Sequence, residues 1–225
     1  MSHSEHLTVP VVTIDGPGGA GKGTVASAVA KAMGWHLLDS GALYRIIAVA
    51  GLADGIALDD TQALVEMSAG LDIVFVDGQV RVNDADVTDA IRTEEAGNSA
   101  SQVAALPPVR DAIFALQQGF RRAPGLVADG RDMGTVVFPD APVKIFLDAS
   151  AEARAERRYN QLKNNGLGVN LRALLEQIQE RDARDRERAV APLKPAEDAL
   201  MIDSTEMTID AVVATVMAQI SSKVE

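Results

Sequence analysis

The sequence contains no cysteine and is short of positive charge. Without a thiol group, neither a disulfide framework nor a thiolate metal site can form. With 21 Lys and Arg residues against 32 Asp and Glu residues, the formal net charge is −11. An acidic chain binds polymeric nucleic acid poorly, because that affinity depends on many phosphate contacts. We therefore expect small-molecule partners and no nucleic acid polymer.

Long apolar runs are also absent. No stretch approaches the length of a membrane-spanning helix, and the polar first residues carry no basic segment followed by an apolar one. This pattern predicts a cytoplasmic protein without a membrane partner. Histidine is scarce at three residues: His3 and His6 lie in the polar N-terminal stretch, and His36 lies in a predicted strand. We assign no protein side chain as a metal ligand.

The length and the hydrophobic pattern predict one α/β domain. At 225 residues and 47% hydrophobic, the chain can bury a substantial core but is near the upper size of a single domain. The runs that we expect to form buried strands are residues 11–14, 35–38, 126–129, 143–148 and 200–203. Helical patterns separate them, which predicts a five-stranded parallel sheet in a three-layer fold with ligands at the C-terminal ends of the strands.

Residues 71–82 have a different pattern. They predict a β-hairpin that turns at residues 77–78, with a third short segment near Val87 and a helix over residues 94–105. A small antiparallel sheet between parallel units predicts an inserted subdomain. We place this insert at about residues 62–105 within a single domain of residues 1–225, whose core covers about residues 8–61 and 106–225.

The strongest motif follows the first predicted strand. Five glycines fall within the eight positions from Gly16 to Gly23, and a helical run of small residues begins just after them. The pattern G-x-x-x-x-G-K is met by Gly16, Gly21 and Lys22, although Gly23 stands where Ser or Thr usually follows and Thr24 comes one position later. Loop amides, a helix N-terminus and a lysine together predict a cradle for phosphate.

Polar clusters follow two further predicted strands. Asp39 and Ser40 come after the second strand, and Asp129, Arg131 and Asp132 come after the third. Because parallel strands end at the same edge of a sheet, we expect these clusters to face the phosphate cradle. Guanidinium groups donate to phosphate, whereas carboxylates accept from a base or a sugar.

Two Arg-rich helices are predicted over residues 151–162 and 171–188. Between positions 154 and 188, nine Lys and Arg residues stand against six Asp and Glu residues. Arg181, Arg184, Asp185 and Arg188 share one helical face, whereas Asp182 falls on another. A glycine-containing turn at residues 166–168 joins the helices, so the pair can close over a ligand as a lid.

This combination of features is typical of phosphoryl transfer. The transition state requires donor and acceptor to be aligned and the charge on the moving group to be neutralised. Lys22 and several arginines supply positive charge, together with Mg²⁺ on the donor phosphates. A lid excludes the water that would otherwise accept the phosphoryl group.

The chain resembles the bacterial cytidylate kinases, a branch of the nucleoside monophosphate kinases, nearly from end to end. The resemblance rests on residues 14–17, 22–24, 38–45, 91–94, 99–104, 128–139 and 181–186. The block at 128–139, with the sequence ADGRDMGTVVFP, is the most specific. The resemblance implies a P-loop NTPase fold, a lid at about residues 152–168, ATP as donor with Mg²⁺, and CMP or dCMP as acceptor. We expect a monomer.

The resemblance also implies the roles of individual residues. The ATP phosphates are held by Gly16, Pro17, Gly18, Gly19, Ala20, Gly21, Lys22, Gly23 and Thr24, joined on closure by Arg157. The acceptor phosphate is held by Arg45, Arg131 and Arg188, with Ser40 and Tyr44 nearby. From its place after the third predicted strand, Asp129 is a further candidate for substrate binding. Cytosine is recognised by Ser101, Arg110 and Asp132, and the ribose by Arg181 and Asp185. The residues implied for the chemical step are Lys22, Arg131, Arg157 and Arg188.

Two alternatives remain open from the residues. The first is a kinase for another monophosphate, UMP or AMP; Asp132 argues against uracil, because a carboxylate accepts from cytosine's amino group and opposes uracil's carbonyl oxygen. The second is a P-loop nucleotide-binding switch that transfers phosphate to no small acceptor. The guanine-binding pattern Asn-Lys-x-Asp of GTPases is absent from the sequence.

Overall fold

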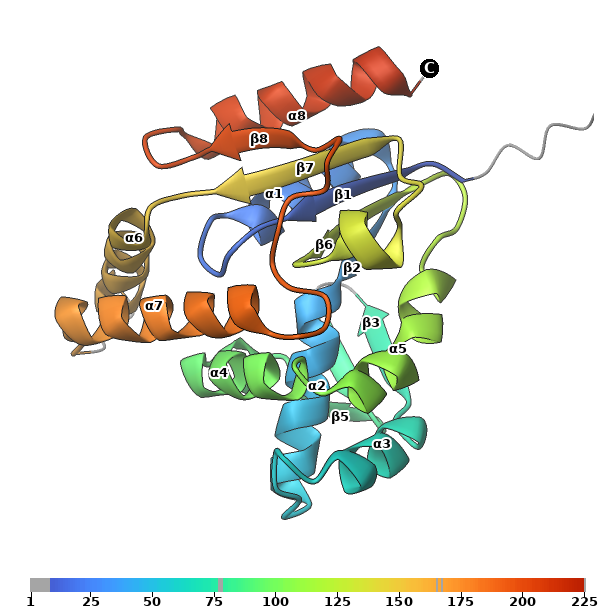
Figure 1. Cartoon of the computed structure of the whole chain (residues 1–225), viewed down its shortest axis with the longest axis vertical. Coiled ribbons are helices and arrows are strands. Elements are labelled where there is room, and N and C mark those ends of the chain that lie inside the picture. The colour runs from blue at the N-terminus through green and yellow to red at the C-terminus, as the bar shows by residue number, and fades with distance from the viewer. Residues whose placement is uncertain (1–8, 77–78, 165, 167, 225) are drawn as a thin grey trace, which may run out of the picture.

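The computed structural model describes residues 9–76, 79–164, 166 and 168–224. At its centre lies a five-stranded parallel sheet in the order β2–β6–β1–β7–β8 (Figure 1). The strands are β1 (Val11–Asp15), β2 (His36–Asp39), β6 (Leu126–Gly130), β7 (Val143–Asp148) and β8 (Leu200–Asp203). Each agrees within one residue with a predicted strand. The predicted α/β fold class is confirmed.

The central strand β1 separates two apolar layers. It pairs with β6 on one side and with β7 on the other, and all of its residues are buried. Alternate side chains of a strand point to opposite faces. Val12 and Ile14 accordingly pack against α1 (Lys22–Met33) and α8 (Ile209–Lys223), whereas Val11 packs against the helices of the other face.

The second layer contains α2 (Ser40–Ala53), α3 (Thr61–Ala69), α4 (Glu94–Val103) and α5 (Pro107–Gly119). Its cluster of buried side chains includes Leu38, Leu43, Val103 and Val109. Short polar side chains cap α2, α3 and α4, as expected for N-caps, whereas α5 begins with a proline and has no side-chain cap. Asp39 Oδ1 accepts a hydrogen bond from the amide of Ala42 at 2.9 Å, which fixes the start of α2 directly after β2.

A three-stranded antiparallel sheet lies within the predicted insert. It consists of β3 (Ile73–Val76), β4 (Gln79–Val82) and β5 (Ala85–Asp86), and the short helix η1 (Ala90–Arg92) follows. Val80 and Val82 pack against Ile46 of α2, which attaches this sheet to the core. The predicted turn at residues 77–78 lies outside the described residues. The boundaries of core, insert and lid stay predictions.

Two long helices lie beyond the carboxyl ends of the strands. They are α6 (Ala151–Asn164) and α7 (Leu171–Glu187), and Figure 1 shows α7 running between the central sheet and α4. The predicted lid covers α6 and part of the connection to α7, in which residues 165 and 167 lie outside the described residues. Within the described part of the chain, no helix combines the length and apolarity needed to cross a bilayer.

The segment after β6 contains an element that was not predicted from the sequence. A π-helical turn, η2 (Met133–Val137), begins shortly after the strand ends. Met133 and Val137 are fully or almost fully buried in the second apolar layer. π-Helical turns are rare and occur most often at functional sites. The turn directly follows the polar cluster of Arg131 and Asp132.

Candidate active site

The phosphate cradle forms where β1 ends and α1 begins. Gly16 and Gly21 have φ angles of 149° and 94°, in the region that favours glycine. At Gly16 a side chain would also collide with the backbone carbonyl of Leu147. Gly21 is the N-cap of α1, so the first turn of the helix opens toward the loop. The amides of this turn are available to an anion.

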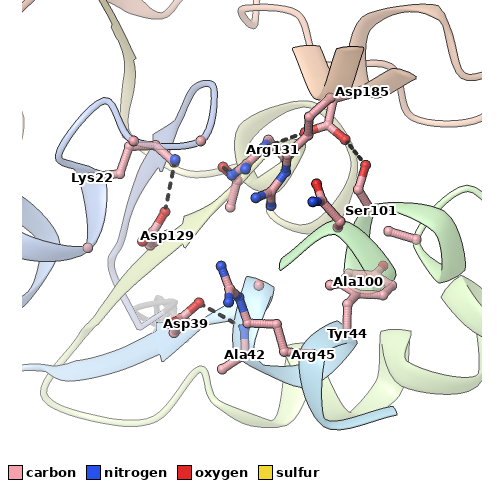
Figure 2. A pocket seen from close by; sticks show the side chains of 18 of the residues that line it. Lys22, Asp39, Ala42, Tyr44, Arg45, Ala100, Ser101, Asp129, Arg131 and Asp185 are labelled. Carbon is pink, nitrogen blue, oxygen red and sulfur yellow. Dashed lines mark hydrogen bonds and ion pairs between the residues drawn. The ribbon is translucent and has the colours of Figure 1, made fainter. Parts of the chain in front are cut away.

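Lys22 lies inside the cradle. Its Nζ donates a hydrogen bond to the carbonyl oxygen of Pro17 at 2.9 Å and stands 3.8 Å from Oδ1 of Asp129 (Figure 2). Burial lowers the pKa of Lys22, and the charge of Arg131 lowers it further. Burial raises the pKa of Asp129, while the charge of Lys22 opposes that change. The two groups therefore form a buried ion pair at the edge of the cradle.

A single cavity of about 520 Å³ extends from this cradle to α4 and α7. Figure 2 shows Lys22, Arg131 and Arg45 pointing into the same space from three different elements. The predicted site residues that line the cavity are Gly18, Gly19, Gly21, Lys22, Gly23, Thr24, Ser40, Tyr44, Arg45, Ser101, Asp129, Arg131, Asp132, Arg181, Asp185 and Arg188. Gly16, Pro17, Ala20, Arg110 and Arg157 are predicted site residues that do not line it.

Asp185 joins three elements on the far side of the cavity. Its Oδ2 accepts from Nε of Arg131 at 3.0 Å, and its Oδ1 accepts from the hydroxyl of Ser101 at 2.6 Å. Although burial raises the pKa of Asp185, the charges of Arg131 and Arg181 hold it below its ordinary value. Nε of Arg181 is buried and has no hydrogen-bond partner within the described residues. This side of the cavity therefore has donor capacity for a ligand oxygen.

Asp132 is the centre of a second charged group. It is 2% exposed and forms an ion pair with Arg110, and its Oδ1 lies 3.8 Å from Nη2 of Arg188. The Arg110 guanidinium stands 5.9 Å from the centre of the Tyr44 ring. Burial raises the pKa of Tyr44 to about 12, so its hydroxyl stays protonated near neutral pH. A carboxylate between two guanidinium groups can accept a hydrogen bond from a ligand while its charge stays balanced.

Residues of α2 face the cavity from a third direction. Arg45 Nη1 donates to the carbonyl oxygens of Ile91 and Thr93 at 2.7 and 3.1 Å. Ser40 is buried, and its hydroxyl accepts a hydrogen bond from Nε2 of Gln117 at 2.9 Å. Gln117 was not among the site residues predicted from the sequence. The signal was its position on the buried face of α5, where a polar side chain at helical spacing from Val109 and Ile113 requires a partner.

The two lid arginines, Arg154 and Arg157, make different contacts in the structure. Arg157 lies outside the cavity and donates to the backbone oxygens of Ser204 and Thr205, at 3.1 Å for Thr205. Arg154 lines the cavity instead: its Nη1 donates to the carbonyl oxygen of Gly18 in the cradle at 3.0 Å, and it pairs with buried Asp182. The described structure therefore does not bring Arg157 to the phosphate cradle, and its role after lid closure stays a prediction.

Oxygen donors for a cation lie at the mouth of the cradle. The carboxylates of Asp39 and Asp129 and the residue Thr24 all line the cavity. Among the described residues, no three His, Asp or Glu side chains are grouped as a metal site. Carboxylates and hydroxyls are ligands that Mg²⁺ prefers, and Mg²⁺ often arrives with substrate phosphates. These residues fit a cation bound to phosphate rather than one held by the protein alone.

The comparisons with known proteins agree with this geometry. The family model described as cytidylate kinase matches residues 12–222. "Cytidylate kinase" of Aeromonas salmonicida (strain A449) is 62% identical over 213 residues, covering 93% of each chain. "Cytidylate kinase" of Methylococcus capsulatus (strain ATCC 33009 / NCIMB 11132 / Bath) is 57% identical over 218 residues, covering 96% of this chain and 98% of that protein.

A solved structure also shares the fold. The crystal structure of an uncharacterized protein from Eubacterium ventriosum ATCC 27560 has a TM-score of 0.52 and 12% sequence identity, and it covers 96% of this chain and 99% of that chain. At this identity the likeness concerns the fold alone. The match of the family model to nearly the whole chain, with relatives about 60% identical, shows that the chain belongs to the cytidylate kinase family.

Proposed function

We propose that this protein transfers the γ-phosphoryl group of ATP to CMP or dCMP, giving CDP or dCDP and ADP. One observation carries the proposal: a single cavity has a phosphate cradle at one end and, at the other, the carboxylate of Asp132 between Arg110 and Arg188. A donor nucleotide and an acceptor nucleotide can meet in such a cavity. The printed names of the curated relatives agree with this assignment.

At the donor end, the amides of residues 16–24 bind the ATP phosphates, and Lys22 neutralises charge on the transferred group. The Arg154 side chain holds the loop by its hydrogen bond to Gly18. Arg157 joins the phosphates when the lid closes. Thr24 and Asp129 would hold a Mg²⁺ ion that arrives with the donor phosphates, and the ion would supply further charge neutralisation.

At the acceptor end, arginines bind the monophosphate. In the structure, Arg45 donates to backbone carbonyls and Arg131 donates to Asp185. A phosphate dianion is a stronger acceptor than a carbonyl, so it can recruit Arg45 together with Arg131 and Arg188. Ser40 and Tyr44 stand beside this phosphate site.

The base and sugar are recognised by the remaining groups. Asp132 accepts a hydrogen bond from the 4-amino group of cytosine, and Arg110 and Ser101 donate to its acceptor atoms. Arg181 and Asp185 bind the ribose hydroxyls. Uracil offers a carbonyl oxygen in place of the amino group, which leaves buried acceptors facing one another and costs binding energy.

In the chemical step, an acceptor phosphate oxygen attacks the γ-phosphorus in line with the leaving oxygen of ADP. Lys22, Arg131 and Arg188 compensate the charge that spreads over the equatorial oxygens. Closure of α6 over the cavity excludes water. We also propose that the protein acts as a monomer. We place the reaction in the cytoplasm, the compartment that supplies ATP.

An ADP-release assay with AMP, CMP, dCMP, UMP and GMP as acceptors tests the proposal. We expect kcat/KM for CMP or dCMP to exceed that for UMP by at least about tenfold, because the wrong base leaves buried polar groups unpaired. A higher kcat/KM for UMP or AMP would assign the enzyme to another acceptor. ADP release that does not depend on any acceptor would indicate a nucleotide-binding switch instead.

A further inference from the structure

The π-helical turn η2 begins immediately behind Asp132. The carbonyl of Asp132 accepts hydrogen bonds from the amides of Val136 and Val137 at 2.9 and 3.2 Å. The first amides of any helical turn have no partner within the turn and need a cap. In η2 these include the amides of Met133 and Gly134, which follow Asp132 directly in the chain.

Asp132 occupies the N-cap position of η2 but does not cap it. Aspartate is one of the preferred N-cap residues, because its side chain can accept from the amides that follow. Here the Asp132 side chain makes no cap hydrogen bond and is paired with Arg110 and Arg188. The Asp132 carboxylate therefore does not bind the backbone amides of η2, and it faces the cavity instead.

Asp15 supplies the missing cap from a distant part of the chain. Its Oδ1 accepts from the amide of Met133 and its Oδ2 accepts from the amide of Gly134, each at 2.8 Å, across 118 and 119 residues of sequence. Asp15 is the last residue of β1, lies opposite Gly130 in the sheet register and is 4% exposed. One side chain therefore connects the end of β1, where the phosphate cradle starts, to the turn behind the acceptor site.

Burying a carboxylate at this position carries a cost in stability. Desolvation raises the pKa of Asp15 to about 7 despite the two amide hydrogen bonds. An apolar residue would suit the buried end of β1 better if packing alone mattered. The residue thus has a use that packing does not explain.

We propose that Asp15 is a positioning residue for acceptor recognition: it caps η2 from another strand and so keeps the carboxylate of Asp132 directed to Arg110, Arg188 and the acceptor base. Without this cap, the Asp132 side chain turns back to its own helical turn. The inference rests on the proposed function, because it assigns Asp132 to the acceptor. It adds a residue that touches neither nucleotide.

The test uses Asp15→Asn, an isosteric change that turns one acceptor into a donor. In the protein without added nucleotide, hydrogen exchange of the Met133 and Gly134 amides, measured by NMR, should become at least about tenfold faster. The reason is that the substitution weakens the hydrogen bonds from these amides to residue 15, which protect them from exchange. With substrates, kcat/KM for CMP should fall by about tenfold to a hundredfold, the size expected for a small misplacement of a recognition group. KM for ATP should stay within about threefold, and the ratio of CMP to UMP activity should narrow.

Asp60→Asn is the matched control. Asp60 caps α3 by accepting from the amide of Ala63 at 3.1 Å, and α3 does not line the cavity. The same chemical change at that cap should leave kcat/KM for CMP and the ratio of CMP to UMP activity unaltered. Combining Asp15→Asn with Asp132→Asn gives a second check: once Asp132 no longer reads the base, the Asp15 change should alter the CMP-to-UMP ratio by less than about threefold.

The outcomes separate the possible roles. Suppose that the Met133 and Gly134 amides of Asp15→Asn exchange faster but the ratio of CMP to UMP activity is unchanged. That result would overturn the positioning role and leave Asp15 a structural cap. Unchanged exchange at both amides would overturn the cap itself. If Asp15→Asn does not fold, hydrogen exchange of the Met133 and Gly134 amides is measured in Asp132→Ala instead. Retained protection of these amides supports the cap by Asp15, and lost protection overturns it. A parent enzyme that prefers another acceptor refutes the proposed function, while the exchange data still test the cap.

Discussion

The positive charge of Lys22 is the sharpest point at which the proposed mechanism can be tested. Lys22 is 5% exposed, and among the described residues its Nζ makes one hydrogen bond to a backbone oxygen, with Asp129 at 3.8 Å. An ammonium group has three donors, so capacity is left for phosphate oxygens. A unit charge about 4 Å away contributes roughly 4 kcal/mol at an effective dielectric constant of about 20. Only the part of this electrostatic stabilisation that is larger in the transition state than in the ground state accelerates the reaction.

We therefore expect Lys22→Ala to lower kcat by about 10²- to 10³-fold, or roughly 2.7–4 kcal/mol, the range found when one preorganised electrostatic contact is removed. Steady-state ADP release with saturating CMP measures this effect. Lys31→Ala is a suitable control, because Lys31 is an exposed residue in the last turn of the same helix. Removing that charge should leave kcat unchanged within about twofold, as for most exposed sites remote from a functional feature.

The loss must also be separated from a loss of folding. Lys22→Ala leaves the buried carboxylate of Asp129 without its cation, and that carboxyl group then binds a proton more readily. Thermal unfolding of the variant should remain cooperative, and ATP binding measured by calorimetry should weaken less than kcat falls. Turnover of CMP within about threefold of the parent by a folded variant would refute the assignment of residues 16–24 as the donor cradle.

Three further predictions follow from the same site. Asp132→Asn should reduce CMP activity and narrow the CMP-to-UMP ratio of kcat/KM by at least about tenfold, or roughly 1.4 kcal/mol; an unchanged ratio in the acceptor assay would mean that the base is read elsewhere. Arg157→Ala should lower kcat more than CMP affinity, because its phosphate contacts form on closure; calorimetry showing lost CMP affinity with normal kcat would contradict this. The pKa of Asp15 is raised from 3.8 to about 7 on folding, so its contribution to stability is complete below about pH 4 and is lost as the pH rises through 7. Between pH 5 and 6, the free energy of unfolding of the parent, measured by urea titration, should therefore fall by about 1.4 kcal/mol more than that of Asp15→Asn. If the two proteins lose stability in parallel over this range, the raised pKa of Asp15 is contradicted.

Much of the fold could be predicted from local patterns. The strands β1, β6 and β7 are short apolar runs buried on both faces, which is typical of parallel sheets. The glycines at 16 and 21 occur where the backbone must adopt angles that other residues avoid. In both cases the information lies within a few consecutive residues, so the sequence alone was sufficient.

The candidate site was predictable in part for a related reason. Residues at the ends of parallel strands meet at one edge of the sheet whatever the strand order. Lys22, Ser40, Asp129 and Arg131 therefore line one cavity, as the position of each after a strand indicated. The acceptor-side roles came from family resemblance and not from spacing, and they stay predictions until the variants are measured.

Only the tertiary structure decided which polar groups pair across the chain. Helical spacing placed Arg154 and Arg157 one turn apart on α6, but the packing of α7 against α6 gives Arg154 the buried partner Asp182 and leaves Arg157 on the loop after β8. Asp15 likewise finds its amide donors 118 residues away, in a π-helical turn that no local pattern indicated. A hydrogen bond depends on distance and direction to within fractions of an ångström, and these are set by how the layers pack. Sequence periodicity fixes which face a residue occupies, and the packed fold fixes what it touches there.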